Sequence, residues 1–432
     1  MLVQHHPIKF DIEQVTTEEV PFLNTFYRHK GELDQDIRDL LDFPVKNQEA
    51  MPFYTVKEST TFKLNEQFEA YYAMMVDALK IAFEDRKLMD KFFDCQFWRE
   101  HGDRFRPYAY TTFLEKHPAL YGRYDACFDP ETEELKGVYE FNGDTPVMLF
   151  ESVNLQARLS EQLGTDQYNN YWDIFIETMK GRGYRNIAVV CGTDYVEDMA
   201  TCETVAQAFR SALPNAVVQF LDLKELDFDH ANISKPWVGK EDETPFDAIY
   251  VLSPWEEMIE TFPEMLDHWA RWVDNVHLFE PAWRWFLAHK GMTALCYELI
   301  QVNYEFRNKH MCHGGRVLIP TWLESEAQKY PTIRHQKLVQ KPVIGRLSNN
   351  IRVWDIEGDE IVCQNDTGGY YSEENTVFQK YVAPGKVEGR NNFILGMWMC
   401  GSHAASLCAR EFDTEVLSIS NERWIPHIVV EG

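Results

Sequence analysis

The sequence lacks the features that mark several large classes of protein. No apolar run approaches the roughly 20 residues that a membrane-spanning helix needs. The first residues, MLVQHHPIKFDIEQ, lack the apolar centre of a secretory signal peptide. The nine cysteines are scattered and form no CxxC pair, so the pattern indicates neither a disulfide framework nor a zinc site. These absences favour a cytoplasmic protein.

Basic residues are also scarce. Lysine and arginine together number 42, against 69 aspartates and glutamates, and the formal net charge is -27. This excess of negative charge argues against a nucleic-acid backbone or an anionic membrane surface as the main partner. It suits a cationic substrate such as a polyamine, or it serves solubility alone.

Two enzyme signatures are missing as well. No serine or cysteine stands in a convincing arrangement for a catalytic triad, so a covalent nucleophile is not indicated. The apolar run Ile187 to Val190 predicts a buried strand of a parallel sheet. The residues after it, Cys191 to Asp194, read CGTD and do not match GxGxxG. An α/β enzyme with its nucleotide in the 187–252 region is therefore an alternative that the sequence does not favour.

Apolar material, in contrast, is plentiful. Hydrophobic residues make up 45% and aromatic residues 14% of the 432 residues. A single core stops growing at roughly 250–300 residues, so we expect two or three lobes. Helical spacing of apolar residues predicts helices at 33–41, 68–83 and 86–98. Alternating strands and helices over 168–280, with strands at 187–190, 216–220 and 247–252, predict an α/β region.

The most informative stretch is YGRYDACFDPETEELKGVYEFNGDTP, residues 121–146. Its two short strands are joined by a polar turn, and side chains two apart on a strand share a face. Arg123 and Asp125 therefore lie on one face of the first strand, and Glu140 and Asn142 on one face of the second. If the strands pair with these faces aligned, two carboxylates, an amide oxygen and a guanidinium form one patch.

Such a patch has the hard oxygen ligands that Mg²⁺ prefers, and Mg²⁺ takes its remaining ligands from water and nucleotide phosphates. An adjacent arginine would stabilise charge on a phosphoryl group in transfer. The alternative is a solvated hairpin with ordinary cross-strand ion pairs. Residues 147–163 are expected to form the helix that follows, with Glu151 in its first turn.

The last third of the chain contains two lysines of interest. Lys290 lies in a segment, 279–299, that predicts one long helix, where a lysine either reaches out to water or binds phosphate in a cleft. Residues 301–318 show no clear period and predict an inserted loop, and His310, Cys312 and His313 in it lack further partners at zinc-ligand spacing. From residue 338 the pattern is rich in strands. Lys341 ends one of these strands before a small-residue turn, which fits either a phosphate-binding loop or an exposed hairpin.

Taken together, four blocks in a fixed order resemble the glutathionylspermidine synthase-like family of ATP-grasp carboxylate–amine ligases, over roughly residues 65–425. The first block, RYD…YEFNGDTP, is similar to the family's RxD…EYNADTP. The second is LSPWEEM, and the third, FEPAWRWFLAHKGM, is similar to EPxW…SNKA. The fourth, QKPVIGRLSNNI, is similar to KPxxGRxGxNI. The resemblance implies a mixed α/β protein with a circularly rearranged ATP-grasp, in which metal ligands precede the ATP lysines.

The resemblance also implies a role for each matching residue. One arginine would act on the transferred phosphoryl group, a second would lie on the cover loop and a third in the site. Lysines and the cover loop would bind ATP, and oxygen ligands would hold two Mg²⁺ ions. The expected catalytic residues are Arg123, Arg346 and Arg410; the expected ATP-binding residues are Lys290, Lys341, Leu347, Ser348 and Gln379; the expected metal ligands are Asp125, Glu140 and Asn142.

The implied activity is ATP-dependent ligation of a carboxylic acid or peptide to an amine through an acyl phosphate. A polyamine is one candidate for the amine. The expected division is a helical N-terminal region at 1–115, a metal-site hairpin and helix at 116–166, a Rossmann-like α/β subdomain on the substrate side at 167–280, and a nucleotide-binding region at 281–432. One departure from the family is Leu347-Ser348 in the cover loop, where the second position is usually glycine. It motivates a second hypothesis, a catalytically degenerate ATP-grasp protein that only binds a nucleotide or an amine.

Overall fold

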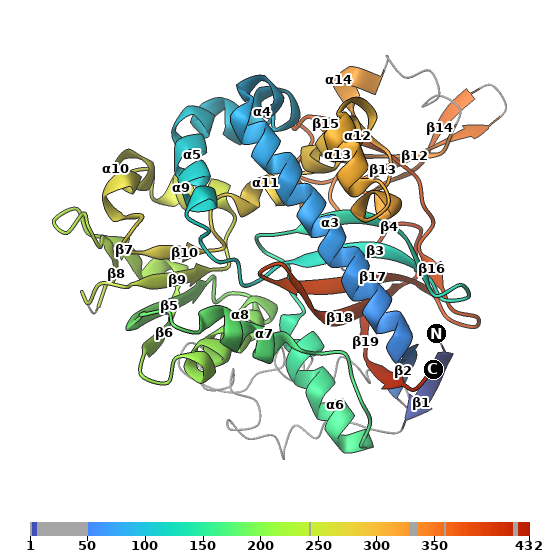
Figure 1. Cartoon of the computed structure of the whole chain (residues 1–432), viewed down its shortest axis with the longest axis horizontal. Coiled ribbons are helices and arrows are strands. Elements are labelled where there is room, and N and C mark those ends of the chain that lie inside the picture. Colours follow the sequence, from blue (N-terminus) through green and yellow to red (C-terminus); the bar gives the residue numbers. More distant parts are fainter. Residues whose placement is uncertain (1, 7–50, 242, 328–335, 358–359, 418–421) are drawn as a thin grey trace.

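The computed structural model describes residues 2–6, 51–241, 243–327, 336–357, 360–417 and 422–432, and the predicted helix at 33–41 lies outside these ranges. Helices and several sheets are interleaved along the chain, which confirms the predicted mixed α/β class (Figure 1). Within the described residues no helix combines the length and the apolar character needed to cross a membrane. The boundaries of the four predicted regions stay a prediction.

An antiparallel sheet, which we call the central sheet, carries the predicted hairpin and joins strands from residues 123–142 to strands from residues 385–425. Its strands follow the order β19-β18-β17-β3-β4, and neighbouring strands are antiparallel. The bounds are β3 Arg123–Asp129, β4 Glu134–Asn142, β17 Asn392–Cys400, β18 His403–Phe412 and β19 Arg423–Ile425, with β16 Gly385–Lys386 beside β17. Residues more than 250 positions apart in the sequence are thereby held side by side.

The helix α3, Glu58–Glu84, lies across this sheet (Figure 1). Its buried residues recur at helical spacing, and Phe68 and Tyr71 pack on Tyr124 of β3. The predicted helix at 68–83 is therefore confirmed. The predicted helix at 86–98 is wrong, because the chain breaks it into α4, Arg86–Phe92, and α5, Gln96–Leu114. The Cys95 thiol accepts the Trp98 amide and caps α5.

The predicted α/β region contains a parallel sheet in the order β10-β9-β5-β6. Its strands are β5 Asn186–Cys191, β6 Val217–Asp222, β9 Ala248–Val251 and β10 His277–Phe279. The helices of this region are α7 Tyr171–Met179, α8 Val196–Ala212, α9 Trp255–Thr261 and α10 Met265–Trp272. The three strands predicted here are confirmed, and the apolar runs of β5 and β9 are buried as a covered parallel sheet requires.

A third, antiparallel sheet holds the residues around Lys341. Its order is β11-β15-β12-β13-β14, with bounds β11 Thr321–Leu323, β12 Leu338–Pro342, β13 Arg352–Glu357, β14 Glu360–Asp366 and β15 Thr376–Lys380. This arrangement confirms the strands predicted from residue 338 onward. The ring of Tyr297 from the neighbouring helix packs against Trp322 of β11. Lys341 and Gln379 thus lie on adjacent strands.

Two predictions between these sheets are wrong. The long helix expected over 279–299 is two helices, α11 Arg284–Ala288 and α12 Gly291–Val302, separated at His289 and Lys290. The loop expected over 301–318 contains α13, Tyr304–His310, and a 3-10 turn at Gly314–Val317. The Asn303 side chain caps α13 by accepting the Phe306 amide. The segment is too short for apolar periodicity to reveal a helix.

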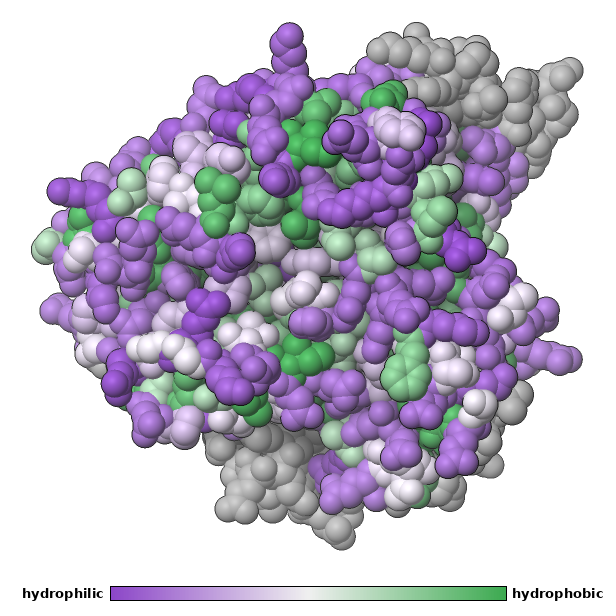
Figure 2. All heavy atoms as spheres, in the orientation of Figure 1, coloured by the Kyte–Doolittle hydropathy of each residue, from purple (hydrophilic) through white to green (hydrophobic). Residues whose placement is uncertain are grey.

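The remaining elements connect these layers. A π-helical turn, Glu151–Leu155, leads into α6, Gln156–Leu163, where the sequence predicted one helix. A small sheet places β2, Met51–Lys57, between β1, Leu2–His6, and β20, His427–Val430. A two-stranded sheet joins β7, Leu226–Phe228, to β8, Trp237–Gly239, and α14 is Glu324–Ala327. The face shown in Figure 2 is largely hydrophilic, as the charge of the chain leads us to expect.

Candidate active site

The register of the hairpin aligns the predicted patch. Arg123 lies opposite Asn142, and Asp125 lies opposite Glu140, so all four side chains are placed on one face of β3 and β4. A β-bulge follows directly after Asp125. The geometric condition set by the sequence is met: two carboxylates, an amide and a guanidinium share a patch.

Asp125 is held by two arginines. Arg123 Nε donates to Asp125 Oδ1 at 2.9 Å, and Arg410 Nη2, from β18, lies 2.7 Å from Oδ2. The Asn142 amide also donates to Oδ2, at 3.1 Å. Burial works to raise the pKa of Asp125, but the two guanidiniums outweigh it and lower the pKa to about 2. The carboxylate is therefore charged throughout the physiological range.

The two arginines have further partners. Arg123 donates to the Val147 carbonyl at 2.6 Å, and its guanidinium lies over the Trp398 ring, 5.5 Å from the centroid. Arg410 donates to Glu422 at 3.1 Å. These contacts hold both guanidinium groups in fixed orientations beside the central sheet. This half of the site, which we call the arginine side (Arg123, Asp125 and Arg410), is fully buried within the fold.

Lys290 enters the site from the break between α11 and α12. Its amide donates to the Val343 carbonyl, and its ammonium donates to the Gly345 carbonyl at 3.0 Å. The ammonium is also 3.4 Å from Glu140. The break between α11 and α12 explains this placement, because it puts Lys290 at the N-cap of α12. The turn there directs the side chain into the site, where the residue is only 8% exposed.

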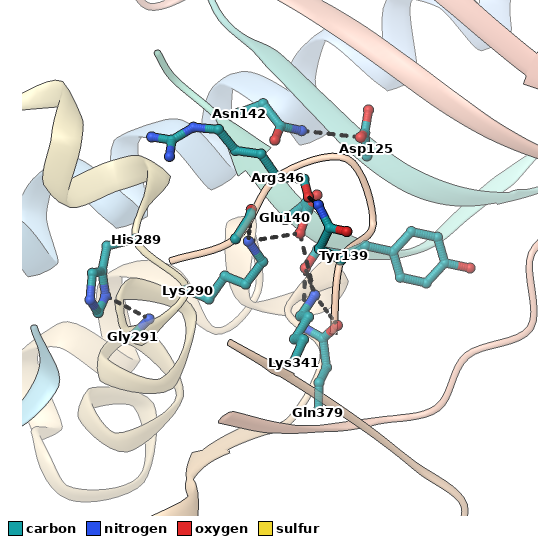
Figure 3. A network of polar contacts seen from close by, with 12 residues as sticks. Asp125, Tyr139, Glu140, Asn142, His289, Lys290, Gly291, Lys341, Arg346 and Gln379 are labelled. Atoms are coloured by element: carbon teal, nitrogen blue, oxygen red, sulfur yellow. Dashed lines mark hydrogen bonds and ion pairs between the residues drawn. The ribbon is translucent and has the colours of Figure 1, made fainter. Parts of the chain in front are cut away.

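Lys341 approaches Glu140 from the third sheet (Figure 3). Its ammonium donates to the Tyr139 carbonyl at 2.9 Å and to Gln379 Oε1 at 3.1 Å, and it is 3.7 Å from Glu140. Burial lowers the pKa of Lys341 to about 8, against the opposing pull of Glu140. We call Glu140, Lys290 and Lys341 the lysine side.

Gln379 is joined to the same network. Its amide donates to Thr321 at 3.1 Å and to the Tyr139 carbonyl at 3.3 Å, and the side chain is buried. Its side chain therefore orients Lys341, whereas a direct role in ATP binding stays a prediction.

The expected cover loop follows Lys341. Leu347, Ser348 and Asn350 have φ values of 55°, 56° and 56°, so three residues with side chains adopt the left-handed conformation that glycine tolerates best. The hydroxyl of Thr367 donates to the Ser348 carbonyl at 2.6 Å and braces the loop. Leu347 is 64% exposed, so its side chain is not part of the polar network that gathers the other predicted residues.

Arg346, at the base of this loop, forms ion pairs with Asp144 and with Glu256, the latter at 3.2 Å. Trp285 Nε1 donates to the other oxygen of Glu256 at 2.8 Å and orients it. Together with Asn142 and Lys290, these side chains line a small cavity of about 20 Å³, which we call the lysine cavity.

Sequence reasoning missed Asp144 and Glu256 as residues of the site. Both stand in blocks that carried the resemblance, NGDTP and PWEE, and this position was the signal that could have pointed to them. It also missed an acidic group near Arg123. Glu151, expected only as a residue of the first helical turn, is buried, and burial together with Glu197 raises its pKa to about 8.

The acidic group continues along the start of α8. Burial, with the charge of Glu197 and then Glu257, raises the pKa of Asp198 to about 7. Burial and the charge of Glu422 also raise the pKa of Glu197. We call Glu151, Glu197 and Asp198 the acidic group.

The patch on the hairpin fits magnesium by its chemistry. Asp125, Glu140 and Asn142 supply oxygen donors only, as Mg²⁺ prefers. Among the residues that the structure describes, no group of three His, Cys, Asp or Glu side chains could hold a metal by itself. An ion here would therefore share its ligands with the phosphates of a nucleotide, and Asn142 also lines the lysine cavity.

The chain is similar to known proteins over most of its length. The model of the family described as glutathionylspermidine synthase preATP-grasp matches residues 46–430. A trypanothione synthetase of Crithidia fasciculata is 23% identical over 324 residues, which is 67% of this chain but 44% of that protein. The chain thus spans less than half of that relative.

Two further proteins are similar over most of the chain. A Haemophilus influenzae protein named "Putative acid--amine ligase" is 23% identical over 345 residues, 74% of this chain and 77% of that protein. Among solved structures, a glutathione synthetase-like effector from Globodera pallida is 12% identical, with a TM-score of 0.45 over 76% of this chain and 84% of that chain.

Proposed function

The chain belongs to the glutathionylspermidine synthase family, and from this premise we propose that it is an ATP-dependent ligase that joins a carboxylic acid to an amine through an acyl phosphate. The observation that carries the proposal is the convergence of cations from distant parts of the chain. Arg123 and Arg410 come from the central sheet, Lys290 from a helix break and Lys341 from the third sheet. They surround carboxylates beside the lysine cavity, which is the arrangement that phosphoryl transfer needs.

The first step of the proposed reaction activates the acid. An amine does not displace hydroxide from a carboxylate at neutral pH, so a substrate carboxylate oxygen attacks the γ-phosphorus of ATP and ADP leaves. Lys290 and Lys341 hold the phosphates, and Arg123 stabilises the charge on the transferred group. Asp125, Glu140 and Asn142 would hold Mg²⁺, two ions being proposed, and the metal would neutralise phosphate charge when bound.

The second step forms the amide. The amine nitrogen attacks the acyl carbon, phosphate leaves with the bonding electron pair, and the nitrogen loses a proton. No covalent enzyme intermediate is needed, because phosphate is already a good leaving group. The acidic group of Glu151, Glu197 and Asp198 supports an approach of the amine from the α8 side, since an ammonium bound there would relieve the repulsion among three carboxyls.

A glutathione-like peptide and a polyamine are the substrates that we propose from family membership. The chain itself supports the cationic partner, with its net charge of -27 and its acidic group. A cytoplasmic location stays a prediction.

One observation favours the second hypothesis, a protein that binds a nucleotide without turning it over. Leu347 and Ser348 both have positive φ where side chains are strained, so the loop has a cost that glycine would avoid. Against it, every predicted metal ligand and both lysines are present and face one another. A site that had lost its activity should have lost some of them.

The test is ADP release with Mg²⁺ and ATP, measured across a panel of acids (glutathione, other γ-glutamyl peptides, amino acids) crossed with amines (spermidine, putrescine, ammonia). ADP that forms only when one acid and one amine are both present supports the ligase and names its substrates. ATP binding in calorimetry with no ADP from any pair would favour the binding hypothesis. ATP hydrolysis that ignores both acid and amine would contradict the ligase.

A further inference from the structure

A fully buried arginine packs against the hairpin of β3 and β4. Arg284, the first residue of α11, is 0% exposed. Its guanidinium lies over the rings of Phe141, Tyr72 and Trp283, at 4.7, 5.4 and 5.7 Å from their centroids. Removing the charge of an arginine from water is costly, so the contacts that it makes must account for its place in the core.

Arg284 holds the backbone that leads into β3. Its Nη2 donates to the Tyr121 carbonyl at 2.7 Å, two residues before the strand begins. Its Nη1 donates to the Tyr72 hydroxyl at 2.7 Å and ties the same guanidinium to α3. Glycine at position 122 permits this approach, because a Cβ there would overlap Arg284 Nη2. The entry to β3 is therefore fixed from α3 and α11 together.

Glu280 holds the same segment. Its Oε1 accepts the Leu120 amide at 2.8 Å. Its Oε2 faces Arg284 Nε at 3.6 Å, and within the described ranges neither of these two atoms has a hydrogen bond. The backbone of Leu120 and Tyr121 is thus held by a carboxylate that accepts an N–H and a guanidinium that donates to a C=O. A buried ion pair adds little stability over apolar residues of the same volume, so its directed bonds are its main contribution.

The same arginine contacts the second strand of the hairpin from behind. Phe141, whose ring lies under the guanidinium, stands between Glu140 and Asn142 in β4 and faces the opposite side of the strand. The helix that begins with the arginine ends at Ala288, and Lys290 follows it with its ammonium 3.4 Å from Glu140. One buried side chain therefore links β3, β4 and the helix break, the three segments on which these site residues lie.

We propose that Arg284 is a positioning residue of the ligase and that Glu280 supports it. Together they hold the two strands of the hairpin in place relative to Lys290. The inference rests on the proposed function, in which Arg123 and Lys290 act on the phosphates of ATP. Phosphoryl transfer depends on the positions of such groups, and a misplacement of about 1 Å can cost about 10² in rate.

The first test is Arg284→Lys, which keeps a positive charge but lacks the planar fork that reaches Tyr121 and Tyr72 at once. We expect kcat for ADP release to fall about tenfold to hundredfold. KM for ATP should change by less than about threefold, because the lysines that bind the phosphates remain. A structural role alone would lower the folded fraction, seen by circular dichroism, and leave kcat per folded molecule at the wild-type value, which would overturn the proposal.

Tyr72→Phe decides the question if R284K does not fold, because it removes one acceptor of Arg284 and keeps the ring under the guanidinium. Tyr71→Phe is the matched control, since Tyr71 is the preceding residue of α3, is also buried and packs on Tyr124. We expect kcat to fall about threefold in Y72F and to stay within about 1.5-fold of the wild type in Y71F. Equal values of kcat in Y72F and Y71F would overturn the proposal.

A binding measurement separates this inference from the proposed function. Calorimetric titration with the ATP analogue AMPPNP at a series of Mg²⁺ concentrations requires no turnover. Asp125 and Asn142, the proposed metal ligands, lie on the two strands that Arg284 holds, so the Mg²⁺ concentration for half-maximal binding should rise about threefold to tenfold in R284K or Y72F and stay unchanged in Y71F. An unchanged Mg²⁺ dependence in R284K and Y72F overturns the inference. A wild type that binds AMPPNP with Mg²⁺ but yields no ADP with any acid–amine pair counts against the ligase alone.

Discussion

The two halves of the site hold their charges in different ways. On the arginine side, Asp125 meets Arg123 at 2.9 Å and Arg410 at 2.7 Å, both within hydrogen-bond length. On the lysine side, Glu140 lies 3.4 Å from Lys290 and 3.7 Å from Lys341, and both ammonium groups donate to backbone carbonyls instead. The charges of the arginine side are thus paired with one another by direct hydrogen bonds, whereas the charges of the lysine side are paired more loosely.

The difference has a consequence for catalysis. Charge-assisted hydrogen bonds in a buried site fix geometry, so the arginine side is organised before any ligand arrives. Lysines whose hydrogen bonds go mainly to carbonyl oxygens still attract an anion strongly. The pKa of Lys341, about 8, shows that the charge of its ammonium group is poorly compensated. We infer that the arginine side sets positions while the lysine side gains most from the phosphates of ATP.

The largest effect should follow from Asp125→Ala. The substitution leaves two guanidiniums without their shared carboxylate, and breaking a buried pair in this way costs about 3–5 kcal/mol of the free energy of unfolding. Turnover should fall by about 10³ or more. Denaturant unfolding and ADP release measure the two effects.

Asp125→Asn is the control, since it keeps the shape of the side chain while losing the charge. The sign of the pH dependence is also fixed. The pKa of Asp125 is lowered to about 2 from 3.8, so its stabilisation is present above about pH 4 and is lost as the pH falls toward 2. A variant as stable as the wild type at pH 7 would remove the distinction between the two sides.

Glu140→Gln should reduce activity with little loss of stability. Glu140 is a proposed metal ligand, so ADP release should fall by about 10²–10³. Its ion pairs are longer than hydrogen bonds, and both lysines keep their carbonyl partners, so the free energy of unfolding should change by about 1 kcal/mol or less. A loss of stability equal to that of Asp125→Ala would mean that the lysine side is a structural ion pair.

An intermediate effect concerns the pH dependence of ATP binding. Below pH 8 Lys341 is mostly charged, and above pH 8 the empty site loses this charge, so affinity for ATP should fall about tenfold between pH 7 and pH 9. By the same shift, the free energy of unfolding should rise with pH between 8 and 10.5, because the unfolded chain binds the extra proton. Calorimetry across this range measures the affinity.

Lys341→Arg is the matched control for this dependence, because arginine stays charged throughout. It should flatten the change in affinity between pH 7 and pH 9 even if it weakens binding at every pH. A wild-type affinity that is constant over the range would contradict the assignment of Lys341 to the phosphate site.

The difference between contacts within one hairpin and contacts between distant strands explains how far the sequence predicted the site. Arg123, Asp125, Glu140 and Asn142 were found from the two-residue spacing of strands, because a short hairpin leaves few registers. Local patterns also identified the parallel strands and the strands around Lys341. The contacts of Arg410 with Asp125 were beyond such patterns, since they depend on β17 pairing with β3 across more than 250 residues.

The failures have physical reasons too. An apolar stretch at 279–299 hides the break at Lys290, because buried residues on both sides of a turn look like one helix. Asp144, in the loop after β4, and Glu256, in the first turn of α9, drew no attention because only the folded position of Arg346 makes them partners. Positive φ at Leu347 and Ser348 likewise depends on bracing by Thr367, nearly 20 residues away.

The smallest expected effect tests whether the strained loop at Leu347 and Ser348 responds to the nucleotide, as we infer for the lysine side. Glycine at position 348 accepts a φ of 56° without the penalty that serine incurs, although it also adds freedom to the unfolded chain, so Ser348→Gly should change stability by no more than about 1 kcal/mol. If the loop must open and close over ATP, turnover should rise about twofold to fivefold, because relieving the strain lowers the cost of one loop state relative to the other.

Leu347→Gly serves as the comparison, because Leu347 has nearly the same φ but is exposed and outside the polar network. A gain in both variants would attribute the effect to backbone strain in the whole loop. A gain in Ser348→Gly alone would place the limiting contact at the residue whose carbonyl Thr367 holds. Unchanged turnover in both would mean that the loop is as fixed as the arginine side, and that the lysines alone respond to the nucleotide.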